Sequence, residues 1–417
     1  MNLSCKILLT IILEVCFVKL HAQCNGCNDP QVRNFTTNAT ENDGSCKYPF
    51  TDFNPPFDFS LPEIVTESSS LVFFRDRLWT TNDSGGKPVI YALDTLTGQV
   101  VQEITVAHVK NVDWEELTMD HDYLYIGDFG NNSGSRTDLK IYKVLLNEIP
   151  IEKKDTVHAG IITFTYPDQK SFDRNFNHNF DCEAFVATED SLYLFSKNRE
   201  DQQTKVYSLP KQAGNYVADL KTTFDARGLI TGAAYNMEEN ELALVGYVQN
   251  IYTPFVWLLS EFQSDDFFGG NKRRIDFPNL ISVQTEGICF VKEDKMKISA
   301  ERSRTTGARV FDLDIARWND LSYKPERHKH SHDPSMQIVG KPESKAKLTL
   351  LLCNIPKGSY RIDVTDFQES IIKQFTIEPD RLHGKSFEID LPELVEGTYS
   401  ISLISSKVML SETFVIE

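Results

Sequence analysis

Acidic side chains recur at spaced positions in the middle of the chain, each at the start of a short apolar run. Glu115, Glu183 and Glu286 each open such a run. Carboxylates held close together raise one another's pKa, and calcium, a hard cation that prefers oxygen ligands, neutralises such groups. If the fold brings these residues together, the sequence predicts a calcium site with Glu115, Glu183 and Glu286 as metal ligands. Glu115 or Glu183 is also a candidate catalytic base.

Each of these apolar runs is followed by a second one, and the two runs are expected to form neighbouring strands. Further polar residues lie just before or at the start of a first run, or at the end of a second run. In two antiparallel neighbouring strands, the start of the first and the end of the second lie on the same side, so we expect these residues to meet around one ligand. The candidate ligand-binding residues are Asn82, Asp83, Asp113, Asp128, Asp181, Lys197, Arg199, Thr231, Glu301 and Arg302. Hydrogen bonding to backbone groups is the alternative role for each acid, and surface salt bridges are the alternative for each basic residue.

The segments that carry these residues form a repeat. Its units begin at Ser69, Glu115, Glu183, Thr231 and Glu286. A period of about 50 residues, with about four short strands in each unit, is typical of a β-propeller. Residues 57–61 are expected to supply the last strand of the final unit and so close the ring. Five blades are favoured. A six-bladed ring with a degenerate blade in residues 145–180 and an open array of β-sandwiches are the alternatives.

The predicted fold class is all-β, with a β-propeller followed by a small β-sandwich. Short alternating or apolar runs between turn residues predict the sandwich. Lys6, followed by an apolar run that is too short to span a membrane, predicts a secretory signal peptide. The expected divisions are a signal peptide at 1–22, a cysteine-bracketed motif at 23–50, the propeller at 51–316, a linker at 317–344 and the sandwich at 345–417.

The charge balance restricts the classes of partner. The 417 residues include 43 Lys and Arg against 60 Asp and Glu, which gives a formal net charge of −17. Nucleic-acid binding needs concentrated Lys and Arg, and anionic membranes attract basic segments, so we expect neither partner. After the predicted signal peptide no apolar run approaches about 18 residues, so we expect no transmembrane span in the mature chain.

The eight cysteines divide by position, and two of them leave with the predicted signal peptide. Cys24, Cys27 and Cys46 form a cluster in which export permits one disulfide, with Cys46 as one partner. A zinc site is the alternative, although no histidine joins the cluster. The other three are expected to be small buried hydrophobic residues. They are Cys182, Cys289 and Cys353.

Several motifs resemble parts of secreted bacterial proteins. Residues 27–48, which include Cys27-Asn28-Asp29-Pro30 and Asp43-Gly44-Ser45-Cys46, resemble a motif of bacterial surface proteins. Residues 65–316 resemble a group of secreted bacterial propellers of unassigned activity. The motifs that carry this resemblance are Asn82-Asp83-Ser84-Gly85, Asp113-Trp114-Glu115, Gly127-Asp128-Phe129-Gly130, Asp181-Cys182-Glu183, Thr231-Gly232 and Glu286-Gly287. More loosely, the acid-lined axis is similar to that of calcium-dependent propeller nucleotidases, lactonases and phytase-like esterases. That likeness implies calcium more than it implies a reaction.

The C-terminal region has a resemblance of its own. Residues 387–401 and the closing segment 412–417 resemble the C-terminal sorting domain of type IX secretion cargo. This resemblance implies export through the periplasm to the outer cell surface or the medium, with the type IX secretion machinery as a partner. A generic accessory β-sandwich is the alternative.

These features together predict an exported cell-surface or secreted β-propeller that binds calcium and a small anionic ligand at an acidic axial site. Metal-dependent hydrolysis of an ester or phosphoester is the candidate reaction. The sequence contains no Gly-x-Ser-x-Gly, Walker or His-Glu-x-x-His motif, so those mechanisms lose support. The competing hypothesis is a non-enzymatic surface module for adhesion or glycan binding, delivered by type IX secretion.

Overall fold

The computed structural model describes residues 25–417 except 152–154, 251, 281, 304–305, 320–334, 340–346, 354, 356–357, 367–369, 378–385, 393, 406–408 and 417. The predicted signal peptide, Cys24 and much of the predicted linker therefore lie outside the described residues. Within the described part of the chain, no helix is both long and apolar enough to cross a membrane.

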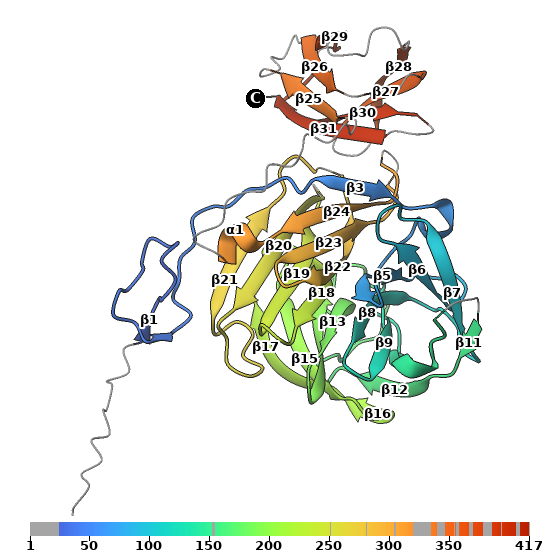
Figure 1. Cartoon of the computed structure of the whole chain (residues 1–417), viewed down its shortest axis with the longest axis vertical. Coiled ribbons are helices and arrows are strands. Elements are labelled where there is room, and N and C mark those ends of the chain that lie inside the picture. The colour runs from blue at the N-terminus through green and yellow to red at the C-terminus, as the bar shows by residue number, and fades with distance from the viewer. Residues whose placement is uncertain are drawn as a thin grey trace, which may run out of the picture.

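Five antiparallel β-sheets make up the larger part of the protein (Figure 1). Two of them also carry a short edge strand that pairs in parallel. The first contains β4 (Val72–Phe74), β5 (Arg77–Thr80), β6 (Val89–Asp94), β7 (Val100–Val106) and β11 (Asp155–Val157). The second contains β8 (Trp114–Met119), β9 (Tyr123–Asp128), β10 (Lys140–Leu145), β12 (Gly160–Thr165) and β16 (Gly214–Val217). The third contains β13 (Asp181–Ala187), β14 (Ser191–Lys197), β15 (Thr204–Pro210) and β17 (Asp219–Phe224).

The fourth sheet contains β18 (Leu229–Asn236), β19 (Glu241–Val248), β20 (Thr253–Ser260) and β21 (Asn271–Asp276). The fifth contains β22 (Thr285–Lys292), β23 (Lys295–Ala300), β24 (Arg309–Asp314) and β3 (Phe57–Ser60). Thus β3, from the N-terminal part of the chain, pairs antiparallel with β24 from the C-terminal end of the ring. The prediction that residues 57–61 complete the last unit is confirmed, and this pairing covers the edge that β24 would otherwise expose.

The sheets form a closed ring. The strands β4, β8, β13, β18 and β22 begin the sheets, and each contacts the next in this order, with β22 returning to β4. A cluster of buried apolar side chains fills the space between each neighbouring pair of sheets. Between the first two sheets, for example, Trp79 and Ile90 pack with Trp114 and Leu117. The arrangement is all-β and propeller-like, and the inner strands surround a common axis.

The described residues of the range 145–180 do not form a sheet of their own. Within this range β11 pairs in parallel with β7, and β12 pairs antiparallel with β10. The range therefore adds edge strands to the first two sheets instead of supplying the degenerate blade that the six-bladed alternative requires. A third segment, β16, extends the second sheet by pairing in parallel with β12.

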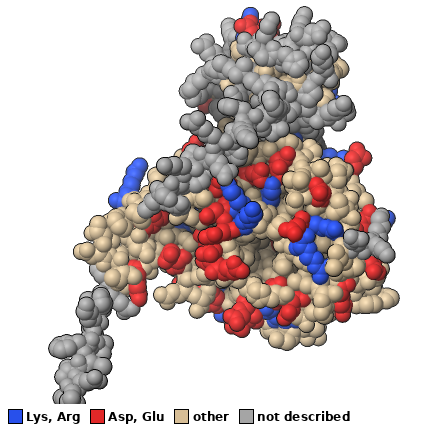
Figure 2. Space-filling model, viewed as in Figure 1, with Lys and Arg blue, Asp and Glu red and all other residues tan. Residues whose placement is uncertain are grey.

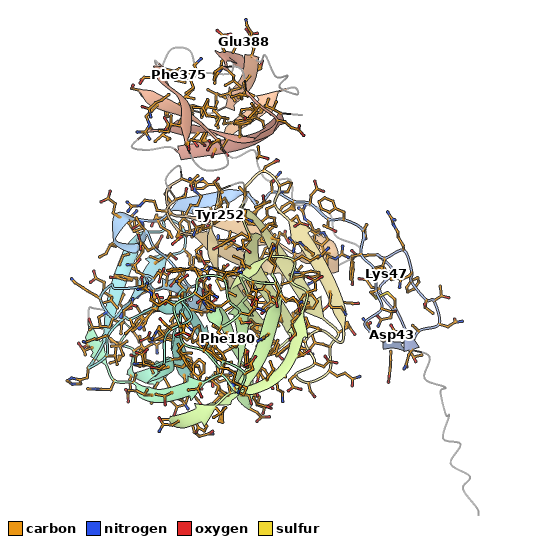
Figure 3. All side chains as sticks on the ribbon, turned by 180° about the vertical axis from the view of Figure 1, so that it is seen from behind. Asp43, Lys47, Phe180, Tyr252, Phe375 and Glu388 are labelled. Atoms are coloured by element: carbon orange, nitrogen blue, oxygen red, sulfur yellow. A yellow bond between two sulfur atoms is a disulfide. The ribbon has the colours of Figure 1, made fainter. Side chains whose placement is uncertain are left out.

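The C-terminal part of the chain contains two further sheets. One consists of β25 (Ser335–Val339), β26 (Lys347–Cys353) and β29 (Ser386–Asp390), so β25 lies within the range expected to be linker. The other consists of β28 (Ile371–Ile377), β27 (Tyr360–Asp366), β30 (Gly397–Ile404) and β31 (Met409–Ile416). A separate core that includes Leu350, Ile362 and Ile401 holds this region together. Figure 3 labels Phe375 and Glu388 in it, apart from Tyr252 and Phe180 on the ring.

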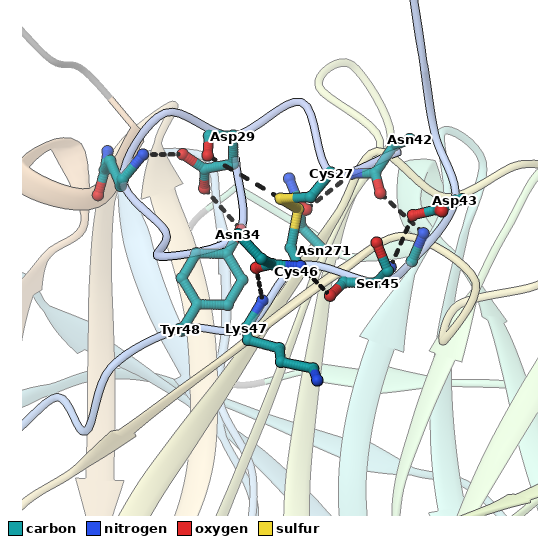
Figure 4. The surroundings of a disulfide bond; sticks show 12 residues. Cys27, Asp29, Asn34, Asn42, Asp43, Ser45, Cys46, Lys47, Tyr48 and Asn271 are labelled. Atoms are coloured by element: carbon teal, nitrogen blue, oxygen red, sulfur yellow. Dashed lines mark hydrogen bonds between the residues drawn. A yellow bond between two sulfur atoms is a disulfide. The ribbon is translucent and has the colours of Figure 1, made fainter. Parts of the chain in front are cut away.

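The N-terminal described segment contains β1 (Asn25–Gly26) and β2 (Glu41–Asn42) and is closed by a Cys27–Cys46 disulfide (Figure 4). The expectation that Cys46 is a disulfide partner is confirmed. Arg273 of β21 connects this segment to the ring, because it donates a hydrogen bond to Gln31 at 2.7 Å and lies 4.2 Å from the ring centre of Tyr48. Two other cysteines, Cys182 and Cys289, are free and buried as expected.

Candidate functional site

A β-bulge interrupts the first strand of four sheets at the same place. The pairing register shifts by one residue at Glu115, Glu183, Thr231 and Glu286. A bulge leaves one residue outside the ladder and turns its side chain in a new direction. Ser69, just before β4, is the corresponding residue of the first sheet, since its neighbour Ser68 bridges to Asn82. The five residues at which the sequence repeat begins therefore share one structural position.

The two hydroxyl side chains of this set join neighbouring sheets. The Ser69 Oγ donates to the Trp114 carbonyl at 3.0 Å, and the Thr231 Oγ1 donates to the Thr285 carbonyl at 2.5 Å. Each accepting residue directly precedes a bulged glutamate of the next sheet. Thr231 is fully buried and does not line the axial cavity, so its contacts are structural rather than those predicted for a ligand-binding residue.

The three bulged glutamates face a cavity of about 200 Å³. Its lining consists of Ser69, Asp83, Glu115, Asn132, Glu183, Lys197, Arg199, Tyr247, Tyr252, Gln284, Glu286 and Glu301. These residues come from all five sheets and the turns that connect their strands. Figure 2 shows acidic side chains and a few basic ones around a hollow near the middle of the ring. The predicted convergence of carboxylates on one axial site is thus present in the structure.

A second shared position supplies four of the lining residues. In each sheet the residue before the bulge pairs with a residue near the end of the second strand, and the shared position is the next residue along that second strand. This position is occupied by Asp83, Lys197, Tyr247 and Glu301. The corresponding residue of the second sheet is Phe129, whose ring is buried in the apolar core instead. Antiparallel pairing therefore brings this position to the same mouth of the ring as the bulges.

One group of three carboxylates has the geometry of a metal site. One carboxylate oxygen from each of Asp83, Asp113 and Glu115 lies within 4.8 Å of the other two. The Glu115 Oε1 atom is buried and has no hydrogen-bond partner. Gly130 packs directly against this group, because a Cβ atom there would lie 1.9 Å from Glu115 Oε1 and 2.6 Å from the Asp113 carboxyl carbon. A buried acceptor without a donor is costly, and a cation would satisfy it.

The charges in this group oppose one another. Burial, followed by the negative charges of Asp83 and Asp181, raises the pKa of Asp113 to about 8. Burial and the charge of Asp83 raise the pKa of Glu115 well above its usual range. Burial also raises the pKa of Asp83, although the backbone N–H of Ser84 and the side chain of Asp113 oppose this rise. Without a cation, therefore, these carboxylates retain protons at a pH at which exposed ones are ionised.

Two basic side chains of the third sheet also line the cavity. The Lys197 ammonium pairs with Glu183, and the Arg199 guanidinium pairs with Asp181. Arg199 also donates to the Asn132 Oδ1 at 2.6 Å. Burial raises the pKa of Glu183 to about 7, while Lys197 limits the rise. Since Asp181 is fully buried and Arg199 is partly exposed, Asp181 positions a cation that can contact a ligand.

Other predicted ligand-binding residues serve the fold. Asp128 lies one residue before the shared second-strand position, and adjacent residues of a strand point to opposite faces. Its carboxylate pairs with Arg136 at 3.0 Å and accepts a hydrogen bond from the Tyr142 hydroxyl at 3.1 Å. Asn82 lies one residue before Asp83 and donates to the Ile64 carbonyl at 2.7 Å.

Arg302 is also outside the cavity lining. Its side chain is exposed, and its backbone N–H donates to the Thr66 carbonyl at 2.8 Å. Glu301, the residue before it, lines the cavity and accepts a hydrogen bond from Gln284 at 2.5 Å. Burial and the charge of Asp83 raise the pKa of Glu301 to about 7. These two neighbouring residues, which directly follow β23, were both predicted to bind the ligand, but only Glu301 lines the cavity.

Several lining residues were not among the predicted site residues. Tyr247 lies 5.2 Å from the ring of Tyr252, and the Lys197 ammonium lies 5.2 Å above the Tyr247 ring. Tyr247 occupies the same position in the fourth sheet as Lys197 does in the third, so the repeat contained a signal for it. Gln284 and Asn132 lie near predicted residues, but their residue types gave no reason to select them.

Glu116 directly follows the bulged Glu115 and is fully buried. Its Oε2 accepts the backbone N–H of Ala233 at 3.0 Å, and its Oε1 accepts that of Leu117 at 2.9 Å. Burial raises its pKa well above the usual range. This side chain connects the second sheet to the fourth, so it stabilises the ring rather than contacting the cavity.

The ring of sheets and its axial acidic cavity define the class as an all-β, propeller-like protein. No protein-family model matches the sequence, and no curated protein matches it. Among solved structures, exo-β-1,3-galactanase of Phanerochaete chrysosporium with galactose is 11% identical, covers 87% of this chain and 99% of that one, and has a TM-score of 0.44. PorZ, a surface component of the type IX secretion system of Porphyromonas gingivalis, is 10% identical and covers 84% of this chain and 45% of that one, with a TM-score of 0.29.

Glutaminyl cyclase of Myxococcus xanthus is 12% identical and covers 63% of this chain and 94% of that one, with a TM-score of 0.35. Structural similarity at these identities and TM-scores assigns no function. The ring is defined by its strand pairing and its core clusters.

Proposed function

We propose that the chain is an exported five-bladed β-propeller that binds calcium at Asp83, Asp113 and Glu115 and holds a small anionic ligand beside the ion. One observation carries the proposal most strongly. Glu115 Oε1 is buried without a partner within a group of three carboxylates whose oxygens lie within 4.8 Å of one another. Desolvated carboxylates that lack donors require either protons or a cation.

The spacing is compatible with calcium. Calcium binds oxygen at about 2.3–2.6 Å, so two of its ligands lie at most about 5 Å apart. The three carboxylate oxygens lie within 4.8 Å of one another, which is inside this limit. Calcium also tolerates irregular coordination, which suits ligands from two neighbouring sheets.

Lys197 and Arg199 are the proposed contacts for the anionic part of the ligand. Both line the cavity, and both are held by buried carboxylates that fix their direction. Glu183 and Glu286 are further lining groups of the same cavity. The mixture of charges suits a ligand whose negative group faces these two basic side chains.

Ester or phosphoester hydrolysis is the reaction that this site supports best. Bound calcium would polarise an ester oxygen. Glu183, whose pKa is about 7 because it is buried, is the proposed general base at neutral pH. Glu115, the other base suggested by the sequence, is assigned to the metal because it belongs to the three-carboxylate group.

The proposal includes export and delivery. The predicted signal peptide at 1–22 would direct the chain to the periplasm, and the C-terminal β-sandwich would act as a type IX sorting domain that delivers it to the outer surface or the medium. Support for the second step comes from the sequence motifs of residues 387–401 and 412–417 and from the separate apolar core of this region.

Calorimetric titration of calcium into the metal-free protein tests the proposal. Wild type and the control Glu238→Gln, an exposed glutamate outside the cavity lining, should bind with equal affinity. Glu115→Gln should bind at least about tenfold more weakly, since even residues behind the metal ligands commonly have effects of this size. Absence of calcium binding in wild type, or equal binding in all three proteins, would contradict the assignment. A panel of chromogenic phosphoesters and lactones then tests hydrolysis, with Glu183→Gln as the variant expected to lose it.

A further inference from the structure

An aromatic side chain forms one wall of the cavity beside its charged groups. Tyr252 lines the cavity and keeps 36% of its surface exposed. It ends the turn that joins β19 to β20, where its backbone N–H donates to the Val248 carbonyl at 2.9 Å. Its φ of 48° lies in the left-handed region, which a bulky aromatic residue rarely adopts. The turn therefore holds an exposed ring against the cavity at some conformational cost.

The ring of Tyr252 is supported from behind. Tyr247, which is almost fully buried, lies 5.2 Å from it at an angle of 40° between the ring planes. The Lys197 ammonium lies 5.2 Å above the Tyr247 ring on the same wall. An aromatic pair held in this way offers a preformed apolar face next to a cation, and an ordered face costs little entropy on binding.

The rest of the cavity favours hydroxyl groups. Glu286, Glu301 and Gln284 line it and present oxygen atoms that accept hydrogen bonds. Its volume of about 200 Å³ is smaller than the range of about 300–1,000 Å³ typical of sites for drug-sized ligands. A single saccharide ring has an apolar C–H face for the aromatic wall and a rim of hydroxyl donors for the acceptors.

We propose that Tyr252 binds the ring of an acidic monosaccharide unit, whose single anionic group points to Lys197 and Arg199. This inference rests on the proposed function and names its ligand class. The anionic group is a carboxylate or a phosphate, because both suit a paired lysine and arginine. The Tyr252 ring covers the C–H face, and the oxygens of Glu286, Glu301 and Gln284 in the same cavity accept the sugar hydroxyls.

Calorimetric binding of four kinds of probe tests the inference, with and without calcium. The probes are galacturonate, glucose 6-phosphate, neutral galactose, and the ringless anions acetate and phosphate. Galacturonate or glucose 6-phosphate should bind more tightly than the neutral and ringless probes, and the tighter of the two identifies the anionic group. Binding of neutral galactose or of the ringless anions as tightly as both acidic sugars would overturn the assignment of an acidic saccharide.

Variants separate the role of the ring from the role of the turn. Tyr252→Asn removes the ring but keeps a residue that tolerates left-handed backbone, and it should weaken acidic-sugar binding by about tenfold. Tyr252→Phe should stay within about twofold of wild type. Phe50→Ala removes an exposed aromatic side chain outside the cavity lining and should have no effect. Unchanged sugar binding in Tyr252→Asn, or equal weakening of the ringless anions, would overturn the inference.

The two proposals fail in different ways. Loss of calcium binding alone would remove the metal assignment, while sugar binding measured without calcium would still report on Tyr252. Normal calcium binding without binding of either acidic sugar would overturn the ligand class and leave the metal site in place.

Discussion

Replacement of Asp113 by asparagine should make the metal-free protein less sensitive to rising pH. Burial, followed by the charges of Asp83 and Asp181, raises the pKa of Asp113 to about 8. In the unfolded chain this pKa is about 3.9. The folded state therefore binds the proton more tightly. The stability that Asp113 contributes is fully present below the unfolded pKa and is lost as the pH rises through about 8.

The size of the effect follows from these two values. Each unit of difference between the pH and the folded pKa corresponds to about 1.4 kcal/mol. At pH 6 the bound proton therefore contributes about 2.7 kcal/mol to the free energy of unfolding, and at pH 9 it contributes almost nothing. Wild type should lose roughly this amount between pH 6 and pH 9 through Asp113, whereas Asp113→Asn should lose none through this residue.

Urea unfolding of the full chain in EDTA, at pH 6 and pH 9, measures this difference. The exposed control Glu238→Gln should follow wild type. Calcium added at pH 9 should restore wild type, by about 2.7 kcal/mol at a concentration 100-fold above its dissociation constant. The same pH dependence in Asp113→Asn and wild type would refute the argument that this buried carboxyl holds a proton in the metal-free protein.

Three further outcomes are expected. Glu116→Ala should lower the free energy of unfolding by about 2–4 kcal/mol, because two buried backbone N–H groups lose their acceptor. Glu116→Gln keeps one acceptor oxygen and should lower it less. Equal losses for the two variants in urea unfolding would contradict this role. Gly130→Ala should weaken calcium binding by about tenfold, because its Cβ would lie 1.9 Å from Glu115 Oε1. Gly86→Ala, whose Cβ would have no atom nearer than 3.6 Å, is the matched control, and equal affinities would oppose the assigned geometry. Deletion of residues 345–417 should leave the protein in the periplasm, as measured by cell fractionation, and normal surface delivery would contradict the sorting assignment.

The repeat in the sequence located the axial site well. Ser69, Glu115 and Thr231 look unlike one another, yet their place at the start of each unit predicted one shared position. The structure places them there because each lies at or beside a bulge or bridge of the first strand. Periodicity of strands is a local signal, and it carries over to the ring because each sheet packs in the same way on the next.

The direction of individual side chains was harder to predict. Asp128 and Asp181 resemble the lining acids in sequence, but both are fully buried and hold Arg136 and Arg199. A shift of one residue along a strand moves a side chain to the opposite face, and a bulge adds such a shift. The sequence shows no bulge directly, so it did not separate lining acids from buried ones.

Long-range pairing was the other part that the sequence left undecided. The strands β11 and β16 are short and pair in parallel with strands distant in the chain. Their residues carry no periodic pattern strong enough to name a partner. Tyr252 was missed for a similar reason, since its role depends on a turn that places it over Tyr247 in the folded ring.

A crystal structure of the protein grown with calcium, with the ion located by its anomalous scattering, would show whether the axial carboxylates bind the metal. We expect one ion bound by oxygens of Asp83, Asp113 and Glu115 at about 2.3–2.6 Å. An axial cavity that holds only water at saturating calcium, or an ion bound elsewhere with Glu115 protonated and unligated, would contradict it.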